Sequence, residues 1–300
     1  MSIEAHSWQP TLGHTQIPIY PSGKVPAATR PLTGAEDMIK VNQPLVAGKS
    51  WIQVRNVSKP TMTIYSPKMK NTGVAMVVLP GGGYQILAID LEGTEICHWL
   101  TANGITCVLL KYRVPAPRSA PYWGSYPQSP IALEDLQRTM GLVRLNAAKW
   151  GIDPKKIGVI GFSAGGSLVA EISTHFKHRL YQPIDSADKV SCRPNFAIAI
   201  YPGHLWINHH KFEINPTIQV SKQTPPTFLL QAENDHEDNV NDSLVYYIAL
   251  KNAGIPVEMH LYPNGGHAFG LRPTQFPITR WPKLVMAWLN SIGMKLSKYK

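Results

Sequence analysis

The stretch IGVIGFSAGG, residues 157–166, decides the fold of this chain. Its first residues predict a buried strand, and a helix-like run begins at Ala164. A serine between two glycines at such a strand-to-helix turn is the G-x-S-x-G pattern of a nucleophile elbow. The tight turn leaves no room for flanking side chains and presents the Ser163 hydroxyl at a helix N-terminus, where the Ala164 N–H can stabilise an oxyanion. Ser163 is therefore the candidate nucleophile; the alternative is a glycine-rich turn that only packs a helix on a strand.

Apolar runs of strand length recur on both sides of this motif. They are too apolar to alternate, as is typical of strands buried on both faces, and they lie at 74–79, 105–110, 157–160, 196–200, 227–230 and 257–262. Segments with apolar residues at helical spacing separate them, at 131–150, 164–176, 240–253 and 281–293. This alternation predicts an α/β fold with a mostly parallel central sheet and helices on both faces. Residues 51–57 and 61–65 predict an antiparallel N-terminal strand pair.

The first fifty residues differ from the rest of the chain. Residues 1–50 are rich in Pro, Gly, Ser and Thr without a sustained period, which predicts an extended N-terminal arm that Trp51 anchors. Residues 51–300 would then form one catalytic domain. Two connections, 113–129 and 202–224, are too long for simple loops, and their aromatic content favours a function.

A second glycine-rich segment, PGGGY at residues 80–84, directly follows the predicted strand at 74–79. Three glycines let a backbone approach a ligand closely and leave its N–H groups unobstructed. Dinucleotide binding is a competing interpretation, but the G-x-G-x-x-G spacing is absent. Beside the elbow, the segment predicts the other half of an oxyanion hole, with the N–H groups of Gly82 and Gly83 as donors.

A histidine and an aspartate follow the last two predicted strands. The segment GGHAFG, residues 265–270, places His267 on a glycine-rich loop where an imidazole can reach Ser163 and act as general base. Asp235 is the first aspartate past the strand at 227–230, which makes it the candidate acid that orients the imidazole; Asp238 is the alternative. The chain order serine, aspartate, histidine is that of the α/β-hydrolases and of neither the chymotrypsin nor the subtilisin type.

Composition and charge exclude several classes of protein. Hydrophobic residues make up 44% and charged residues 16%, which suits a globular core. The net charge of +10 comes from scattered basic residues, so we expect a solvated positive surface and no nucleic-acid partner. No apolar run approaches the roughly 18 residues of a membrane span and no signal peptide is visible. We therefore expect no membrane partner and a cytoplasmic protein as given, or a secreted or periplasmic one if a leader has been removed.

Cysteines and histidines predict neither a disulfide framework nor a metal centre. Cys97, Cys107 and Cys192 are widely spaced and odd in number, and Cys107 lies in an apolar run as buried packing would. His209 and His210 are adjacent, so in a strand they would point opposite ways, and no third ligand has a suitable spacing. The predicted chemistry needs no cofactor.

At these residues the chain resembles the bacterial acetyl esterase and acetylxylan esterase-like branch of the α/β-hydrolases, which is related to the hormone-sensitive-lipase group. The matching stretches span roughly residues 50 to 290 and lie at 79–84, 150–154, 158–166, 201–203 and 265–270. The resemblance implies an α/β-hydrolase fold and carboxylic-ester hydrolase activity. It also implies catalytic roles for Ser163, Asp235 and His267 and an oxyanion hole at Gly82, Gly83 and Ala164. Pro80 and Ser167 depart from the pattern, because many relatives carry histidine there.

The expected reaction is hydrolysis of a short acyl ester, most often acetyl, of a carbohydrate or another small molecule, through an acyl-enzyme on Ser163. Candidate substrate contacts are the aromatic and polar residues Tyr84, Tyr112, Arg113, Trp123 and Trp206. Loop anchoring, and a structural ion pair for Arg113, are the alternatives. Two other functions remain open: a serine peptidase of the prolyl-oligopeptidase type, which generally needs a large extra domain, and a ligand-binding protein, which normally has a broken triad. The oligomeric state is not predicted.

Overall fold

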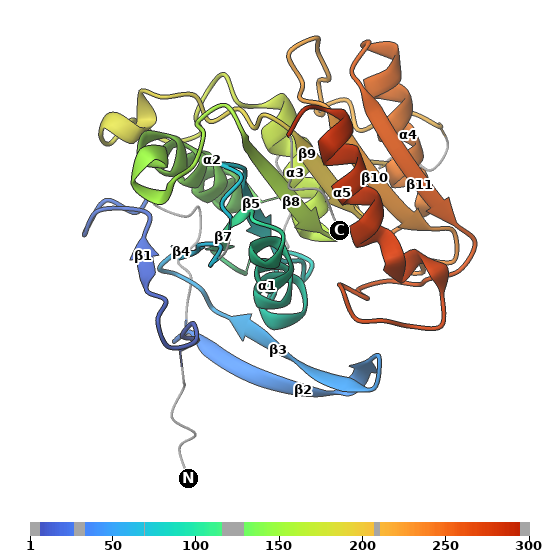
Figure 1. The fold of residues 1–300 in the computed structure, drawn as a ribbon, viewed down its shortest axis with the longest axis horizontal. Helices are drawn as coiled ribbons and strands as arrows, with labels where there is room; N and C mark the ends of the chain where they lie inside the picture. The colour runs from blue at the N-terminus through green and yellow to red at the C-terminus, as the bar shows by residue number, and fades with distance from the viewer. Residues whose placement is uncertain (1–6, 27–33, 69, 116–128, 207–210, 295–300) are drawn as a thin grey trace.

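A mostly parallel sheet forms the centre of the molecule (Figure 1). The computed structural model describes residues 7–26, 34–68, 70–115, 129–206 and 211–294. Within these ranges the sheet has eight strands in the order β1-β4-β7-β5-β8-β9-β10-β11. Their bounds are β1 Gln16–Pro18, β4 Thr61–Tyr65, β5 Ala75–Leu79, β7 Thr106–Lys111, β8 Ile157–Phe162, β9 Ala197–Ile200, β10 Thr227–Ala232 and β11 Val257–Tyr262. The pairings from β7 to β11 are parallel, and β1 and β4 form an antiparallel edge pair.

Helices cover both faces of this sheet (Figure 1): α1 Glu95–Ala102, α2 Pro130–Leu145, α3 Ala164–Thr174, α4 Val240–Asn252 and α5 Trp281–Ser291. Neighbouring residues of a strand point to opposite faces. On β8, the ring of Phe162 lies 6.1 Å from that of Trp281 on α5, whereas Gly161 lies against the first turn of α3. Helices α3 and α5 therefore cover opposite faces. Helix α1 shares the face of α5, because Trp99 contacts Trp281 with 5.3 Å between ring centroids.

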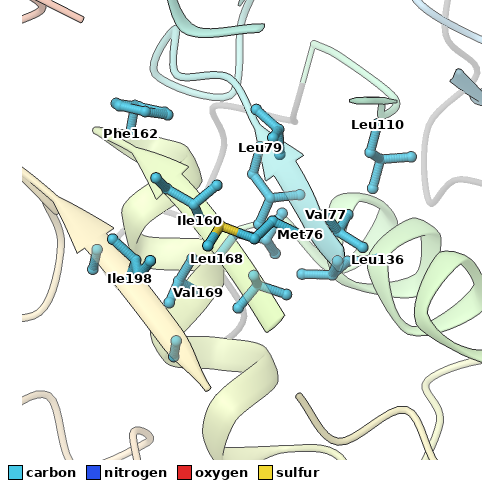
Figure 2. Packing of buried hydrophobic residues seen from close by; sticks show 14 of the residues in the cluster. Met76, Val77, Leu79, Leu110, Leu136, Ile160, Phe162, Leu168, Val169 and Ile198 are labelled. Carbon is cyan, nitrogen blue, oxygen red and sulfur yellow. The ribbon is translucent and has the colours of Figure 1, made fainter. Parts of the chain in front are cut away.

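The two central strands carry the core. Every residue of β5 and β8 is buried, which explains why their sequences do not alternate. Figure 2 shows Leu79 and Ile160 of these strands packed among apolar side chains that include Leu136 of α2 and Leu168 of α3. Close-packed interiors are rigid. The carboxyl ends of β5 and β8, which lead into the glycine segment at 80–84 and into Ser163, are therefore fixed relative to each other.

A second, three-stranded sheet lies beside the central one and consists of β2 Asp37–Val46, β3 Lys49–Arg55 and β6 Leu87–Ala88. Ala47 and Gly48 join β2 to β3 with φ values of 49° and 74°, a two-residue turn of the kind that suits hairpins. Arg272 fastens this turn, because its Nη1 donates to the carbonyl oxygens of Lys49 and Ser50 at 3.2 and 3.0 Å. The hairpin is thus held in place by a residue far along the chain.

Most predicted elements are confirmed, and the pairing of the N-terminal strands is corrected. The six apolar runs and the four helical segments form strands and helices at nearly the expected bounds, while α1 was not predicted. Residues 51–57 and 61–65 do not pair with each other: β3 pairs with β2 and β6, whereas β4 pairs with β1 and β7. The antiparallel edge pair therefore draws its outer strand from Gln16–Pro18. The division of the chain at residue 50 stays a prediction, and strands from both sides of it pair with each other.

The expectation of no disulfide is wrong for two of the three cysteines. Cys97 on α1 and Cys107 on β7 form a disulfide with 5.1 Å between their Cα atoms, and Cys192 is free and buried. The two cysteines belong to consecutive elements that pack on each other. The spacing of the cysteines alone did not indicate this disulfide, because the sequence analysis did not predict α1, the helix that carries Cys97.

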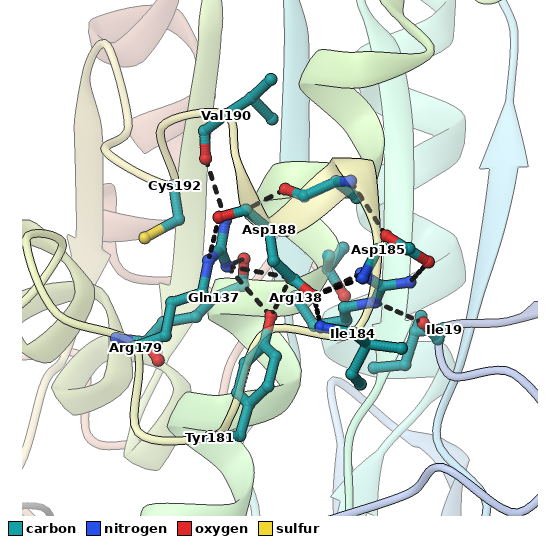
Figure 3. Close-up of polar contacts among 12 residues, drawn as sticks. Ile19, Gln137, Arg138, Arg179, Tyr181, Ile184, Asp185, Asp188, Val190 and Cys192 are labelled. Atoms are coloured by element: carbon teal, nitrogen blue, oxygen red, sulfur yellow. Dashed lines mark hydrogen bonds and ion pairs between the residues drawn. The ribbon is translucent and has the colours of Figure 1, made fainter.

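A buried polar network fastens the segment after α3 to helix α2 (Figure 3). Arg138 on α2 donates to both carboxylate oxygens of Asp185, at 2.7 and 2.6 Å, and to Asp188 at 2.9 Å. The Arg138 Nε donates to the carbonyl oxygen of Ile19 at 2.8 Å, and Tyr181 donates to Asp188 at 2.5 Å. Buried charges persist only where such partners satisfy them. The network therefore holds the N-terminal segment and the loop together and has a structural role.

Candidate active site

A pocket of about 690 Å³ opens where the central strands end, and it contains Ser163 and His267. The glycine segment contributes Gly82 and Gly83 to its wall. The small sheet contributes a further, apolar part of the wall: Pro44, Leu45, Val46, Trp51 and Ala88. The hairpin that the sequence predicted as part of an arm therefore helps to form the pocket.

Ser163 occupies a strained turn between β8 and α3. Its φ and ψ are 51° and −120°, in a region that residues with side chains rarely adopt. A Cβ on Gly161 would run into the carbonyl oxygen of Gly165, and a Cβ on Gly165 would run into that of Leu79. Both flanking glycines are thus required by the packing of α3 on the sheet, as the elbow pattern predicts.

His267 bridges Ser163 and Asp235. Its Nε2 lies 3.0 Å from the Ser163 Oγ, and its Nδ1 lies 2.8 Å from Oδ2 of Asp235. The Asp235 side chain is fully buried, and its other oxygen accepts the N–H groups of Glu237 and Asp238 at 3.0 and 3.1 Å. An ionised carboxylate can only accept, so the Nδ1 carries the proton and the Nε2 is free to take one from Ser163. The structure thus brings the three predicted triad residues together in the expected chain of contacts.

The loop that carries His267 is held from two sides. Asn234 accepts the N–H groups of Gly265 and Gly266 at 2.9 and 3.0 Å, and the ring of Tyr201 lies 4.9 Å from the imidazole. Asn234 directly precedes Asp235, so one turn after β10 fixes both the loop and the imidazole. Sequence analysis identified neither Asn234 nor Tyr201.

The electrostatic surroundings raise the pKa of His267. Burial disfavours the imidazolium and lowers the pKa, but the hydrogen bond to Asp235 and its charge, with smaller contributions from Asp238 and Glu92, outweigh burial. The imidazole therefore takes up a proton at a higher pH than a free histidine does. A general base must be neutral, so this raised pKa sets the pH below which base catalysis is lost.

The glycine segment forms a tight turn at the pocket wall. Gly82 has a φ of 133° and its carbonyl oxygen accepts the N–H groups of Gln85 and Ile86 at 2.9 and 3.1 Å. That hydrogen bonding satisfies the Gly82 carbonyl, and Gly82 and Gly83 line the same pocket as Ser163, so their N–H groups are the candidate oxyanion donors. The first N–H groups of a helix have no partner within it, so Ala164 at the start of α3 can join them.

Glu92 is a buried carboxylate that sequence analysis missed. It lies on the short π-helical turn Asp90–Thr94 and is 1% exposed. One of its oxygens accepts the Gly81 N–H at 2.7 Å and the other accepts the Tyr201 hydroxyl at 2.8 Å. Burial raises the pKa of Glu92, although these two hydrogen bonds and the charge of His267 oppose the rise. The residue joins the glycine segment to the ring beside His267, and nothing in the local sequence distinguished it from its acidic neighbours Asp90 and Glu95.

Two of the expected substrate contacts are corrected. Tyr112 and Arg113 are fully buried, so neither reaches the pocket surface. Tyr112 donates to the carbonyl oxygen of Pro80 at 2.5 Å, which supports the glycine segment from below. Arg113 forms ion pairs at 2.8 Å with Glu134 and Asp135, the structural pairing that was the alternative.

The other expected contacts also lie away from the pocket lining. Tyr84 is 1% exposed, and its ring stacks on that of His204 with 6.3 Å between the ring centroids. Trp206 donates its indole N–H to the carbonyl oxygen of Lys211 at 2.8 Å, which is the anchoring role. Trp123 lies outside the described residues. Trp51, which the sequence analysis interpreted as an anchor for the arm, lines the pocket.

Asp238, the alternative acid, lies on the other side of the imidazole. Its Oδ2 is 3.2 Å from the Ser163 Oγ and 3.8 Å from the His267 Nε2. It does not approach the Nδ1, which Asp235 occupies. A carboxylate in this position faces the reacting atoms rather than orienting the base.

The described part of the chain contains no group of three or more His, Cys, Asp or Glu that could hold a metal ion. His209 and His210 lie outside it. None of the helices found there has the length and apolar character that crossing a membrane requires.

Sequence comparisons relate the chain to several named hydrolases. The profile of the prolyl oligopeptidase family matches residues 134–293, and the BD-FAE profile matches residues 62–201. The acetylxylan esterase of Xylanibacter ruminicola is 30% identical over 261 residues, which cover 80% of this chain and 50% of that protein. Endo-1,4-beta-xylanase B of Butyrivibrio fibrisolvens is 30% identical over 218 residues, which cover 67% of this chain and 33% of the relative. The chain thus spans half the length, or less, of these curated relatives.

Solved structures include a relative that this chain matches over almost the whole length of both. The acetyl ester-xyloside bifunctional hydrolase from Caldicellulosiruptor lactoaceticus superposes with a TM-score of 0.71 and is 30% identical. The match covers 93% of this chain and 97% of that one. The fold is therefore shared with this relative over most of both chains.

Proposed function

The chain belongs to the acetylxylan esterase-like branch of the α/β-hydrolases, and from this membership we propose that it is a serine carboxylesterase that removes short acyl groups, acetyl above all, from carbohydrate esters. The observation that carries the proposal is the chain of contacts from Ser163 through His267 to Asp235 at the pocket wall. The similarity to the acetylxylan esterase and to the acetyl ester-xyloside hydrolase supports the carbohydrate part.

The proposed reaction proceeds in two acyl-transfer steps. Ser163 attacks the ester carbonyl while His267 takes its proton, and the N–H groups of Gly82, Gly83 and Ala164 stabilise the oxyanion. His267 then returns the proton to the leaving alcohol, and an acyl-enzyme remains. Water attacks that ester by the same route and releases the acid. The nucleophile, the base and the oxyanion donors in this scheme all belong to the chain, and the scheme uses no cofactor.

We expect a preference for short acyl chains. The hairpin that Arg272 holds in place contributes Leu45 to the pocket wall, and Leu91 also lines it, so we expect this wall to limit the length of the acyl group that fits. In an open apolar tunnel each added methylene would gain about 0.8 kcal/mol, and activity would rise with chain length. The measurement is kcat/KM for p-nitrophenyl esters from acetate to decanoate. A maximum between acetate and butyrate is expected, and a maximum at octanoate or beyond would contradict the proposal.

The match to the prolyl oligopeptidase family makes a serine peptidase the second candidate. The same triad can cleave an amide, so the discriminating comparison uses one acyl group on two leaving groups. p-Nitrophenyl acetate should be hydrolysed and 4-nitroacetanilide should not. Hydrolysis of short peptidyl p-nitroanilides with kcat/KM values equal to those for the esters would favour the peptidase.

We also propose that the protein works in an oxidising compartment, the secreted or periplasmic alternative. The disulfide between Cys97 and Cys107 supports this, because such bonds persist outside the reducing cytosol. Thiol titration of the unfolded, unreduced protein should find only Cys192, and all three cysteines after reduction. Three titratable thiols in protein isolated from its own cells without reductant would contradict the proposal.

A further inference from the structure

A second carboxylate faces the reacting atoms of the candidate site. Asp238 places its Oδ2 3.2 Å from the Ser163 Oγ and 3.8 Å from the His267 Nε2, and its side chain is 14% exposed. The proposed two-step reaction uses only Asp235, on the far side of the imidazole. The position of Asp238 therefore needs an explanation of its own.

Asp238 is held in this position rather than resting there by chance. Its backbone N–H donates to Asp235 at 3.1 Å, and its carbonyl oxygen accepts the Gln231 side chain at 2.8 Å. Gly203 lies directly against the carboxylate, and a Cβ on that glycine would collide with Oδ1. The surrounding backbone thus leaves space for the Asp238 side chain and fixes its direction.

Asp238 loses a possible hydrogen-bond donor during the reaction. The Ser163 hydroxyl lies within hydrogen-bond distance of its carboxylate and can donate to it. His204, which lines the same pocket, also interacts electrostatically with this carboxylate. A hydroxyl has a single proton, which Ser163 must give to His267 when it attacks. The ester oxygen that replaces the hydroxyl carries no proton, so the carboxylate can no longer accept a hydrogen bond from Ser163. The loss of a donor to a buried carboxylate is costly, and a substrate that supplies a new one gains affinity.

The missing donor would come from the alcohol half of the ester. The leaving oxygen receives its proton from the His267 Nε2 and must lie within hydrogen-bond distance of that atom. The Asp238 Oδ2 is 3.8 Å from the same nitrogen, so it lies beside the leaving oxygen. A hydroxyl on the carbon next to the ester-bearing carbon would point at this carboxylate.

We propose that Asp238 is a specificity-determining residue that accepts a hydrogen bond from a neighbouring hydroxyl of the alcohol half, so that the site selects esters of vicinal diols and sugars. The inference rests on the proposed esterase function and names the feature of the alcohol that the site recognises. The proton balance of the reaction is unchanged. The Ser163 proton passes to His267 and then to the leaving oxygen, while the neighbouring hydroxyl keeps its own proton throughout.

The test compares two esters that share the acetyl group. 2-Hydroxyethyl acetate offers the neighbouring hydroxyl, and 2-methoxyethyl acetate replaces it with an ether of similar size and leaving ability. Both form the same acyl-enzyme, so the ratio of their kcat/KM values reports only acylation. Hydrogen bonds to charged groups are strong, so we expect the wild-type protein to favour the hydroxyl ester by about tenfold or more.

The variant Asp238→Asn should reduce this ratio to near one, because the amide is uncharged and a weaker acceptor. Glu237→Gln is the matched control: Glu237 also lines the pocket but is exposed, so its loss removes the same charge and should leave the ratio unchanged. The wild-type ratio is measured first and does not depend on how well a variant folds.

Two results would overturn the inference alone: a wild-type ratio near one with clear hydrolysis of both esters, or an unchanged ratio in Asp238→Asn. If the wild-type protein hydrolyses neither these esters nor p-nitrophenyl acetate, the esterase function itself fails. An equal fall of the ratio in Glu237→Gln and Asp238→Asn would assign the preference to pocket charge and would also overturn the role of Asp238.

Discussion

Replacing Ser163 with alanine is expected to lower kcat for ester hydrolysis by about a million-fold while the protein stays folded. The acyl group has no other acceptor at this position, since His267 and Asp235 act only through the Ser163 hydroxyl. Residual turnover would come from the oxyanion donors and from binding alone. The strained turn should tolerate the change, because alanine removes one oxygen atom and leaves the backbone and both flanking glycines as they are.

The measurement is hydrolysis of p-nitrophenyl acetate by purified protein, with circular dichroism to establish folding. Ser167→Ala is the matched control, because Ser167 lies one turn further along α3 and its hydroxyl donates to the carbonyl oxygen of Gly203 at 2.6 Å. That variant should stay within about tenfold of wild type, the scale of one lost hydrogen bond. A Ser163→Ala protein that is folded and retains more than a few per cent of the activity would require another nucleophile.

Local signals in the sequence were sufficient to predict which loops contribute to the candidate site. The elbow, the glycine segment and the histidine loop each follow a strongly apolar strand, and parallel strands bring their carboxyl ends to one edge. Once the strands at 74–79, 157–160 and 257–262 were assigned, the proximity of their following loops was a consequence of the fold. Asp235 was identified on the same grounds, as the first aspartate past its strand.

What the sequence could not predict depends on contacts between distant segments. The hairpin of β2 and β3 has few buried residues of its own and is fixed by Arg272, some 220 residues away. Strand β3 therefore looked like a partner of β4 when only neighbours along the chain were considered. Glu92 could not be predicted for the same reason. Its role depends on hydrogen bonds from Gly81 and Tyr201, and no local sequence pattern connects these residues with it.

The predictions of substrate contacts were wrong for a related reason, since they too depended on packing between distant segments. Aromatic and basic residues in long loops favour a binding role in general, but Arg113 and Tyr112 have partners that bury them completely. The pocket wall is instead built partly from Leu45 and Trp51, whose segment lacked any functional pattern. Composition indicates which loops are unusual, and only packing decides which side chains face the substrate.

Asp235→Asn is expected to lower kcat by about ten-thousand-fold, and Asp238→Asn far less, when both are measured with p-nitrophenyl acetate. An asparagine at 235 can donate to the His267 Nδ1 and so favour the tautomer with its proton on the Nε2, which cannot accept the Ser163 proton. Asp238 does not contact the Nδ1, and p-nitrophenol carries no neighbouring hydroxyl for it to bind. The reverse ranking would assign the orienting role to Asp238.

The pH dependence of the same variants separates orientation from charge. Asp235 and Asp238 both raise the pKa of His267, and Asp235 contributes more. Removing either carboxylate therefore lowers that pKa, the imidazole stays neutral to lower pH, and the acid-side fall of kcat/KM should move to lower pH. Asp238→Asn should show this shift with most of its activity at neutral pH retained, whereas Asp235→Asn should show a larger shift on a greatly reduced rate. If the acid-side midpoint of kcat/KM stays in place in both variants, a group other than His267 controls the acid-side fall. The pKa of His267 depends on both carboxylates, so a midpoint set by His267 would have to move.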